Sequence, residues 1–128
     1  MRVLSANRLD VMLDLDFGFT LRRVFRLKGF DSHGLGREAY DAAKHCLITL
    51  AGSKKLIVRP EPSTRRDWHT MTVIPANVYL PVRLDTKPIG FVEDMPDAHG
   101  AALDLGTHMK WLGTRGFEVQ LVRDMLRR

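Results

Sequence analysis

The chain has 128 residues, of which 45% are apolar and 27% are charged, and its formal net charge is +5. This length suits one domain spanning residues 1–128 around a single hydrophobic core, and the composition excludes an intrinsically disordered chain. No apolar run approaches the roughly 20 residues of a membrane-crossing helix, the N-terminal stretch predicts no secretory signal, and Cys46 alone cannot form an intrachain disulfide. We therefore expect a cytoplasmic protein with no membrane partner.

The N-terminal part of the chain predicts a β-ribbon. Residues 9–15 alternate between apolar and acidic side chains, and residues 20–27 form a second strand-like run. Gly18 lies between them at the position of a tight reversal, so the two runs predict a long hairpin. The same ribbon is expected to begin earlier, at Val3 and Leu4.

A loop and a helix are expected after the ribbon. Residues 29–36 contain three glycines, which predicts a loop. Over residues 37–52, small and apolar side chains recur at helical spacing, beginning with Ala39 and Ala43. We expect this small-residue face to let the helix plug one end of a β-barrel.

Further strands are predicted in the middle of the chain. Residues 54–60 predict a short strand that ends at a proline. Residues 69–75 and 77–84 also alternate in strand fashion, but Pro75 and Pro81 interrupt them. Because proline cannot donate a ladder hydrogen bond, these prolines predict sheet edges or bends rather than a central strand.

The C-terminal part predicts an irregular segment and then helices. Residues 85–102 contain two prolines, two glycines and an acidic cluster, which predicts an irregular excursion. Helical spacing returns over residues 105–128, where Gly113 and Gly116 are expected to separate two short helices. The whole order is three strands, one helix, two strands and a helical C-terminus. It predicts a mainly β, α+β fold, namely a five-stranded OB-fold barrel with a capping helix after the third strand.

The ordered motifs of the N-terminal half resemble those of staphylococcal-nuclease-like proteins, the thermonuclease homologues. Residues 9–32, LDVMLDLDFGFTLRRVFRLKGFDS, are similar to a family segment in which D-L-G-F-G is followed by a strand ending in R-L-x-G-I-D-x-P-E. The resemblance covers residues 4–59 well and residues 105–119 more loosely. It implies an OB barrel and an ancestry among enzymes that cleave DNA or RNA phosphodiesters with Ca²⁺, and the small size and the D-L-D-F-G-F variant look like those of phage-encoded members.

The resemblance implies two retained site residues and three lost ones. In the family's R-L-x-G-I-D motif the arginine contacts the scissile phosphate and the aspartate holds the metal, and these positions are Arg26 and Asp31. Asn7 stands in place of the second metal aspartate, Gly34 in place of the glutamate that handles the attacking water, and Thr70 in place of a second phosphate arginine.

These losses predict that the family's reaction does not run in this chain. An amide at Asn7 removes a negative charge, and Arg8 beside it adds a positive one, so a Ca²⁺ ion is disfavoured. Without the metal no bound water is activated, and the missing glutamate removes a further general-base contribution of about 10²–10⁴-fold. We expect no metal site, no cofactor and no enzymatic activity.

Three alternatives to this loss remain open. Glu38 either replaces the missing glutamate or is a charge in the first turn of a helix. His33 is either a metal-free general base or a solvent-facing loop histidine. The excursion either holds an unrelated metal or is a solvated loop, and its candidate ligands are Glu93, Asp94, Asp97 and His99.

An OB barrel without catalytic residues can still bind, and the positive net charge favours anionic partners such as phosphate backbones. Single strands bind such barrels through a positive groove and stacking aromatic rings. The candidate nucleic-acid contacts are Arg26, Lys54, Lys55, Arg59, Arg65, Arg66 and Trp68. Arg26 has a second interpretation, as the structural ion-pair partner of Asp31.

The leading hypothesis is therefore a catalytically degenerate, nuclease-like OB-fold protein that binds nucleic acid through a basic face. One alternative is a protein–protein interaction module, such as an inhibitor or adaptor of a partner enzyme. The other is a residual metal-dependent phosphodiesterase.

Overall fold

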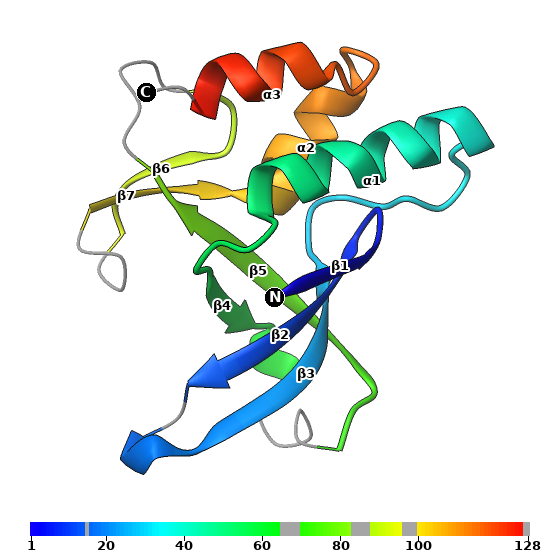
Figure 1. The fold of residues 1–128 in the computed structure, drawn as a ribbon. Helices are drawn as coiled ribbons and strands as arrows, with labels where there is room; N and C mark the ends of the chain where they lie inside the picture. The colour runs from blue at the N-terminus through cyan, green and yellow to red at the C-terminus, as the bar shows by residue number, and fades with distance from the viewer. Residues whose placement is uncertain (15, 65–69, 83–87, 96–99, 127–128) are drawn as a thin grey trace.

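The computed structural model describes residues 1–14, 16–64, 70–82, 88–95 and 100–126. Within these residues the fold is a mixed α+β one, in which a curled sheet forms a half-barrel beside three helices (Figure 1). The strands are β1 (Arg2–Ser5), β2 (Arg8–Asp14), β3 (Thr20–Leu27), β4 (Ile57–Pro60), β5 (Val73–Pro81), β6 (Phe91–Met95) and β7 (Gly100–Asp104). The helices are α1 (Arg37–Ala51), α2 (Leu105–Gly113) and α3 (Val119–Leu126), with short 3₁₀ turns at Asp16–Gly18 and Pro62–Thr64.

The predicted N-terminal ribbon is confirmed. β1, β2 and β3 are consecutive antiparallel strands, and β1 contains Val3 and Leu4 as expected. The chain reverses between β2 and β3 at Phe17 and Gly18, which have φ angles of 64° and 77°. Along the ribbon, residues alternate between a buried face, which includes Leu9 and Phe25, and an exposed face.

The prediction that the prolines mark an edge or a break is wrong for Pro75 but agrees with the end of the strand at Pro81. A single strand, β5, runs through Pro75 and pairs with β3 in parallel and with β4 and β7 antiparallel, so it is central to the sheet. The Pro75 carbonyl accepts a hydrogen bond of 2.9 Å from the backbone N–H of Glu61, just beyond the end of β4. Proline has no backbone N–H. At Pro75 the missing N–H would point to this same side of β5, where the pairing of β4 with β5 ends. Pro81 is the last residue of β5.

The prediction of an irregular excursion over residues 85–102 is wrong for residues 91–95 and 100–102, whereas residues 85–87 and 96–99 lie outside the described residues. β6 and the first residues of β7 lie within this range, so the sheet has two more strands than we expected. The two strands pair antiparallel, with Phe91 opposite Leu103 and Val92 opposite Ala102, and β7 in turn pairs with β5. The proline and glycine content misled the prediction because pairing with a distant strand outweighs local propensity.

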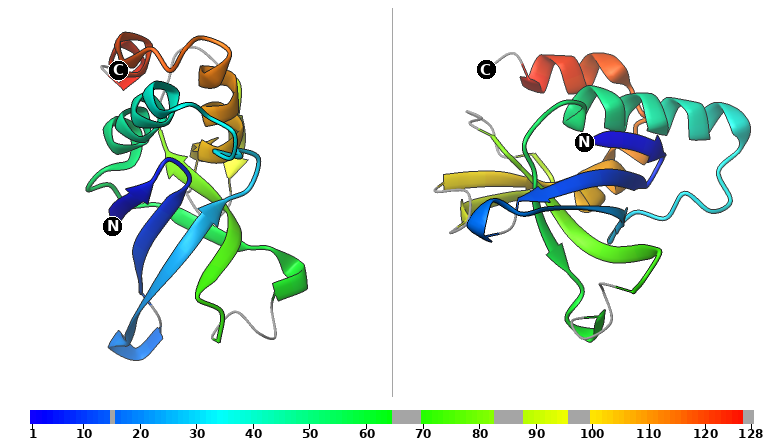
Figure 2. Two further views of the ribbon diagram at one scale, coloured as in Figure 1. Left: turned by 90° about the vertical axis from the view of Figure 1, so that its right-hand side faces the viewer. Right: turned by 60° about the horizontal axis from the view of Figure 1, so that its bottom comes forward.

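The predicted helices are confirmed. α1 lies between β3 and β4 and turns Ala43, Cys46, Leu47 and Leu50 into the core. α2 and α3 follow β7 and are separated near Gly113 and Gly116 as expected. All three helices gather at one end of the sheet, whereas the β2–β3 hairpin projects from the opposite end (Figures 1 and 2).

Cys46 joins two of these helical segments. Its thiol donates a hydrogen bond of 3.0 Å to the backbone carbonyl of Phe117, in the connection between α2 and α3. Burial raises the pKa of the Cys46 thiol to about 11, so the reactive thiolate is scarce at neutral pH. The side chain is therefore a structural contact and not a nucleophile.

His108 is a fully buried histidine on α2. Its Nδ1 atom lies 2.8 Å from the carbonyl oxygen of Ile89, so Nδ1 carries the hydrogen and donates it, while Nε2 has no hydrogen-bond partner among the described atoms. Burial lowers the pKa of His108 below its usual value of 6.5, and the bond to Ile89 only partly offsets this.

We predict that acid destabilises the fold through His108. In the unfolded chain the imidazole takes up a proton near pH 6.5, whereas the lowered pKa of folded His108 delays its protonation, so lowering the pH favours the unfolded state by up to about 1.4 kcal/mol per pH unit. Urea unfolding between pH 7.5 and 5.5 should therefore show that the unfolding free energy falls more steeply with decreasing pH for the wild type than for His108→Asn. This variant keeps a hydrogen-bond donor near the Nδ1 position. His45→Asn, at an exposed site on α1, is the control and should retain the wild-type slope.

Candidate nucleic-acid interface

The exposed face of the β1–β2–β3 ribbon is rich in arginine. Because side chains alternate along a strand, burying Leu9 and Phe25 turns the neighbouring arginines outward. We call this surface the arginine face, and it is made of Arg2, Arg8, Arg22 and Arg26.

One carboxylate lies within the arginine face. Asp10, with a side chain only 12% exposed, forms ion pairs of 3.8 Å with both Arg2 and Arg22. The two arginines remain largely exposed, so each pair is weak and leaves the guanidinium groups accessible. Asp14 is on the same side at the far end of β2, so the ribbon has two negative charges against four positive ones on this side and the face remains net positive.

Arg8 and Arg26 form the unbalanced part of this face. They are directly opposite one another in the β2–β3 register, and both are exposed. Neither makes an ion pair or a side-chain hydrogen bond with a described residue. Like charges directly opposite in a sheet are destabilising, and an anion placed between them relieves the repulsion.

The other family-derived positions lie around this pair. Asn7 is in the turn between β1 and β2 and is buried. Its side-chain oxygen accepts a hydrogen bond of 3.4 Å from the Ser5 hydroxyl, and its backbone carbonyl accepts one of 2.8 Å from the backbone N–H of Leu27. Asp31 is exposed and accepts a hydrogen bond of 2.9 Å from the backbone N–H of His33. It makes no ion pair with Arg26 in the described part of the chain, so the two are not a buried structural pair.

The remaining replaced positions are on the surface. Gly34 has a φ of 85° in the loop before α1, and a side chain there would meet nothing within 4 Å. Thr70 is exposed just before β5. Glu38 is exposed in the first turn of α1, and Glu93 is on β6, while Asp97 and His99 lie outside the described residues.

No cluster of three or more His, Cys, Asp or Glu side chains able to hold a metal occurs among the residues that the structure describes. The predicted loss of the calcium site stays a prediction. Glu38 and His33 lie on the surface near Asp31 in sequence, and the ion pairs of the described residues do not join Glu38 to Arg26.

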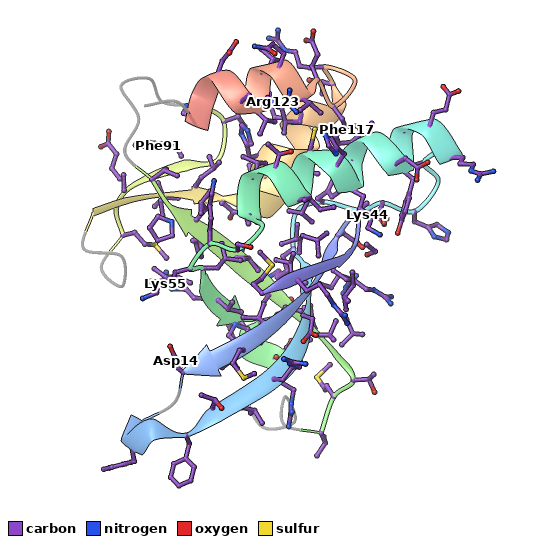
Figure 3. All side chains as sticks on the ribbon, viewed as in Figure 1. Asp14, Lys44, Lys55, Phe91, Phe117 and Arg123 are labelled. Carbon is purple, nitrogen blue, oxygen red and sulfur yellow. The ribbon has the colours of Figure 1, made fainter. Side chains whose placement is uncertain are left out.

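Lys54 and Lys55 line a groove of about 360 Å³ beside the arginine face. The groove lies between the end of β2 and the start of β4, and Figure 3 shows Asp14 and Lys55 at these two places. A smaller hollow of about 170 Å³, lined in part by Arg2 and Arg22, shares Met1 and Met12 with the groove, so the two are adjacent.

The other predicted contacts are not brought to this surface by any described interaction. Arg59, on β4, places its guanidinium carbon 5.5 Å from the centre of the Tyr79 ring, on the neighbouring strand. Arg65, Arg66 and Trp68 lie outside the described residues.

Known proteins offer no guide to this surface. Comparisons with protein-family models, with curated proteins and with solved structures found no match. None of the helices in the described ranges is both long and apolar enough to cross a membrane. Any function must therefore be argued from the geometry and charge of this chain.

Sequence reasoning missed several members of the candidate interface. Arg8 was considered only as a charge that opposes a metal, because its position opposite Arg26 depends on a strand register that the sequence does not display. Phe17 and Phe19, at the tip of the β2–β3 hairpin, are 95% and 68% exposed. The signal for them was available, since D-F-G-F places two aromatic residues on either side of a turn glycine.

Proposed function

We propose that this chain is a nucleic-acid-binding module of the staphylococcal-nuclease type that has lost the metal-dependent reaction. The observation that carries this proposal is the exposed Arg8–Arg26 pair, two like charges held opposite one another with no ion-pair partner among the described residues. A phosphodiester oxygen between them removes the repulsion and forms charge-assisted hydrogen bonds. Arg2 and Arg22 extend the positive surface along the same ribbon.

The fold supports the finer proposal of an OB barrel of this type. In the sheet, β3 pairs with β5 in parallel, β4 pairs with β5, and α1 lies between β3 and β4. This is the strand order expected of an OB-fold with its helix after the third strand. In such folds the exposed strands and hairpin loops are the surfaces that bind oligonucleotides, and we propose that the protein acts in the cytoplasm.

Salt dependence tests this function. A fluorescently labelled single-stranded oligonucleotide should bind with an affinity that falls as salt rises, and a plot of log K against log salt should have a slope of about −2 to −3 if three or four phosphates are neutralised. Fluorescence anisotropy at several salt concentrations measures this slope. Affinity that ignores salt, or cleavage of the oligonucleotide in the presence of Ca²⁺, would contradict the proposal.

Phe17 is expected to add base stacking to this binding. Its φ of 64° suits asparagine or glycine better than phenylalanine, so keeping an exposed ring there costs about 1–2 kcal/mol. Stacking of a base on an aromatic ring contributes about 1–3 kcal/mol. We predict that Phe17→Asn lowers the affinity for single-stranded DNA about 5- to 100-fold while raising the unfolding free energy by up to about 1–2 kcal/mol.

Anisotropy and urea unfolding measure these two effects. The matched control is Ile48→Asn, which removes an exposed apolar side chain from α1 and should leave DNA binding unchanged. If Phe17→Asn bound DNA as tightly as the wild type, the hairpin tip would have no part in binding.

A further inference from the structure

Among the described strands, β1 and β6 are the two ends of the sheet, and β2 and β4 each also have an edge that is partly or wholly open. β1 covers β2 only as far as Asp10, which pairs with Arg2, so the edge of β2 from Val11 to Asp14 has no strand beside it. Among the described strands, β4 pairs with β5 alone, so its other edge is also open. An open edge presents backbone N–H and C=O groups that readily pair with another chain.

The open edges of β2 and β4 border one groove, the one of about 360 Å³. The end of β2 contributes the apolar side chains of Val11 and Leu13, and the β4 side contributes those of Leu56 and Val58. The volume is within the range of small ligand pockets, which is enough for a few residues of an extended chain. The groove therefore combines apolar contact surface with backbone hydrogen-bonding groups.

The charges beside the groove are mainly positive. Lys54 and Lys55 are both exposed, and neither makes an ion pair with a described residue. Asp14 lines the groove on the β2 side (Figure 3). Acidic side chains of a bound chain would find two free ammonium groups here.

We propose that this groove binds an extended acidic peptide, which adds a strand to the open edge of β2. The peptide backbone supplies the N–H and C=O groups that Val11–Asp14 lack on this side. Its alternate side chains face Val11, Leu13 and the β4 side, and its acidic side chains reach Lys54 and Lys55. This is the mode in which main-chain hydrogen bonds give affinity and alternate side chains give specificity.

The open edges favour a peptide over a nucleic acid at this place. A phosphodiester backbone has no N–H groups to donate to the strand carbonyls, whereas a peptide backbone has both donors and acceptors. The site is separate from the Arg8–Arg26 pair, so the proposal does not depend on nucleic-acid binding.

A synthetic hexapeptide of alternating valine and glutamate, labelled with fluorescein, is a suitable probe for the full chain. We expect saturable binding by fluorescence anisotropy, and added protection from amide hydrogen exchange at Val11–Asp14. The same peptide with alternate backbone nitrogens methylated cannot pair with the strand edge and should lose binding. Lys54→Glu/Lys55→Glu should weaken the valine–glutamate peptide by about tenfold or more.

The control for this variant is Lys110→Glu/Arg123→Glu, which makes the same change of charge at exposed positions on α2 and α3 and should leave peptide binding intact. Equal binding of the methylated peptide, or of a valine–lysine peptide, would overturn the proposal. So would saturable binding with no protection at β2, or occupation of the groove by a second copy of the chain. DNA binding measured on the same Lys54→Glu/Lys55→Glu protein separates failure of this site from failure of the arginine face.

Discussion

Reversing both charges of the Arg8–Arg26 pair is expected to lower the affinity for single-stranded DNA by about 100-fold or more at low salt. Arg8→Glu/Arg26→Glu removes two phosphate contacts and replaces them with repulsion, so the salt slope should also become shallower by about 1–2. Fluorescence anisotropy over a salt series measures both quantities. Lys110→Glu/Arg123→Glu, with the same net charge, should bind nearly as well as the wild type.

A milder change at the same pair separates binding from folding. Arg8→Gln relieves the repulsion from Arg26, so the unfolding free energy should rise by about 0.2–1 kcal/mol while DNA affinity falls. Urea unfolding of Arg8→Gln measures the expected gain in stability, and fluorescence anisotropy of the same protein measures the expected loss of DNA affinity. A structural role for Arg8 predicts the reverse, with stability lost and binding unchanged.

The largest expected loss of stability is that of Gly106→Ala. Gly106 is buried in the first turn of α2, where an added methyl group would collide with the backbone carbonyl of Lys28. That carbonyl cannot easily move away, because the N–H of Lys28 donates a hydrogen bond of 2.9 Å to Ala76 on β5. We expect a loss of about 3 kcal/mol or more, since the clash is with fixed backbone.

Urea unfolding measures this loss. Gly36→Ala is the matched control, because a methyl group there meets nothing within 4 Å. It should reduce the unfolding free energy by no more than about 1 kcal/mol, the range of a helix N-cap change. A Gly106→Ala protein as stable as the control would show that α2 does not press against the chain at Lys28.

The elements that the sequence predicted correctly are those whose signals are local. The ribbon, α1 and the two C-terminal helices each have a clear period and a glycine near one end. The errors are at β5, β6 and β7, where Pro75 and the residues after Pro88 suggested irregular structure. These strands form because they pair with segments far along the chain, which no local pattern reveals.

The same distinction applies to the candidate site. Arg26 and the two lysines could be named from the sequence, because a basic residue in an exposed strand or loop is visible there. The significance of Arg8 could not, since it depends on a register in which Arg8 lies opposite Arg26. The groove beside Lys54 and Lys55 depends on two strands that fail to meet, which is a property of the assembled sheet.

The central position of β5 has a consequence for how the molecule assembles. One segment of nine residues supplies a neighbour to β3, β4 and β7, so among the described strands it alone links the N-terminal ribbon to the C-terminal hairpin within the sheet. Its parallel contact with β3 closes a long loop that contains α1 and β4, and such closures slow folding. We therefore expect the docking of β5 to be a slow step in folding, and we expect the β5 amides to be among the best protected from hydrogen exchange.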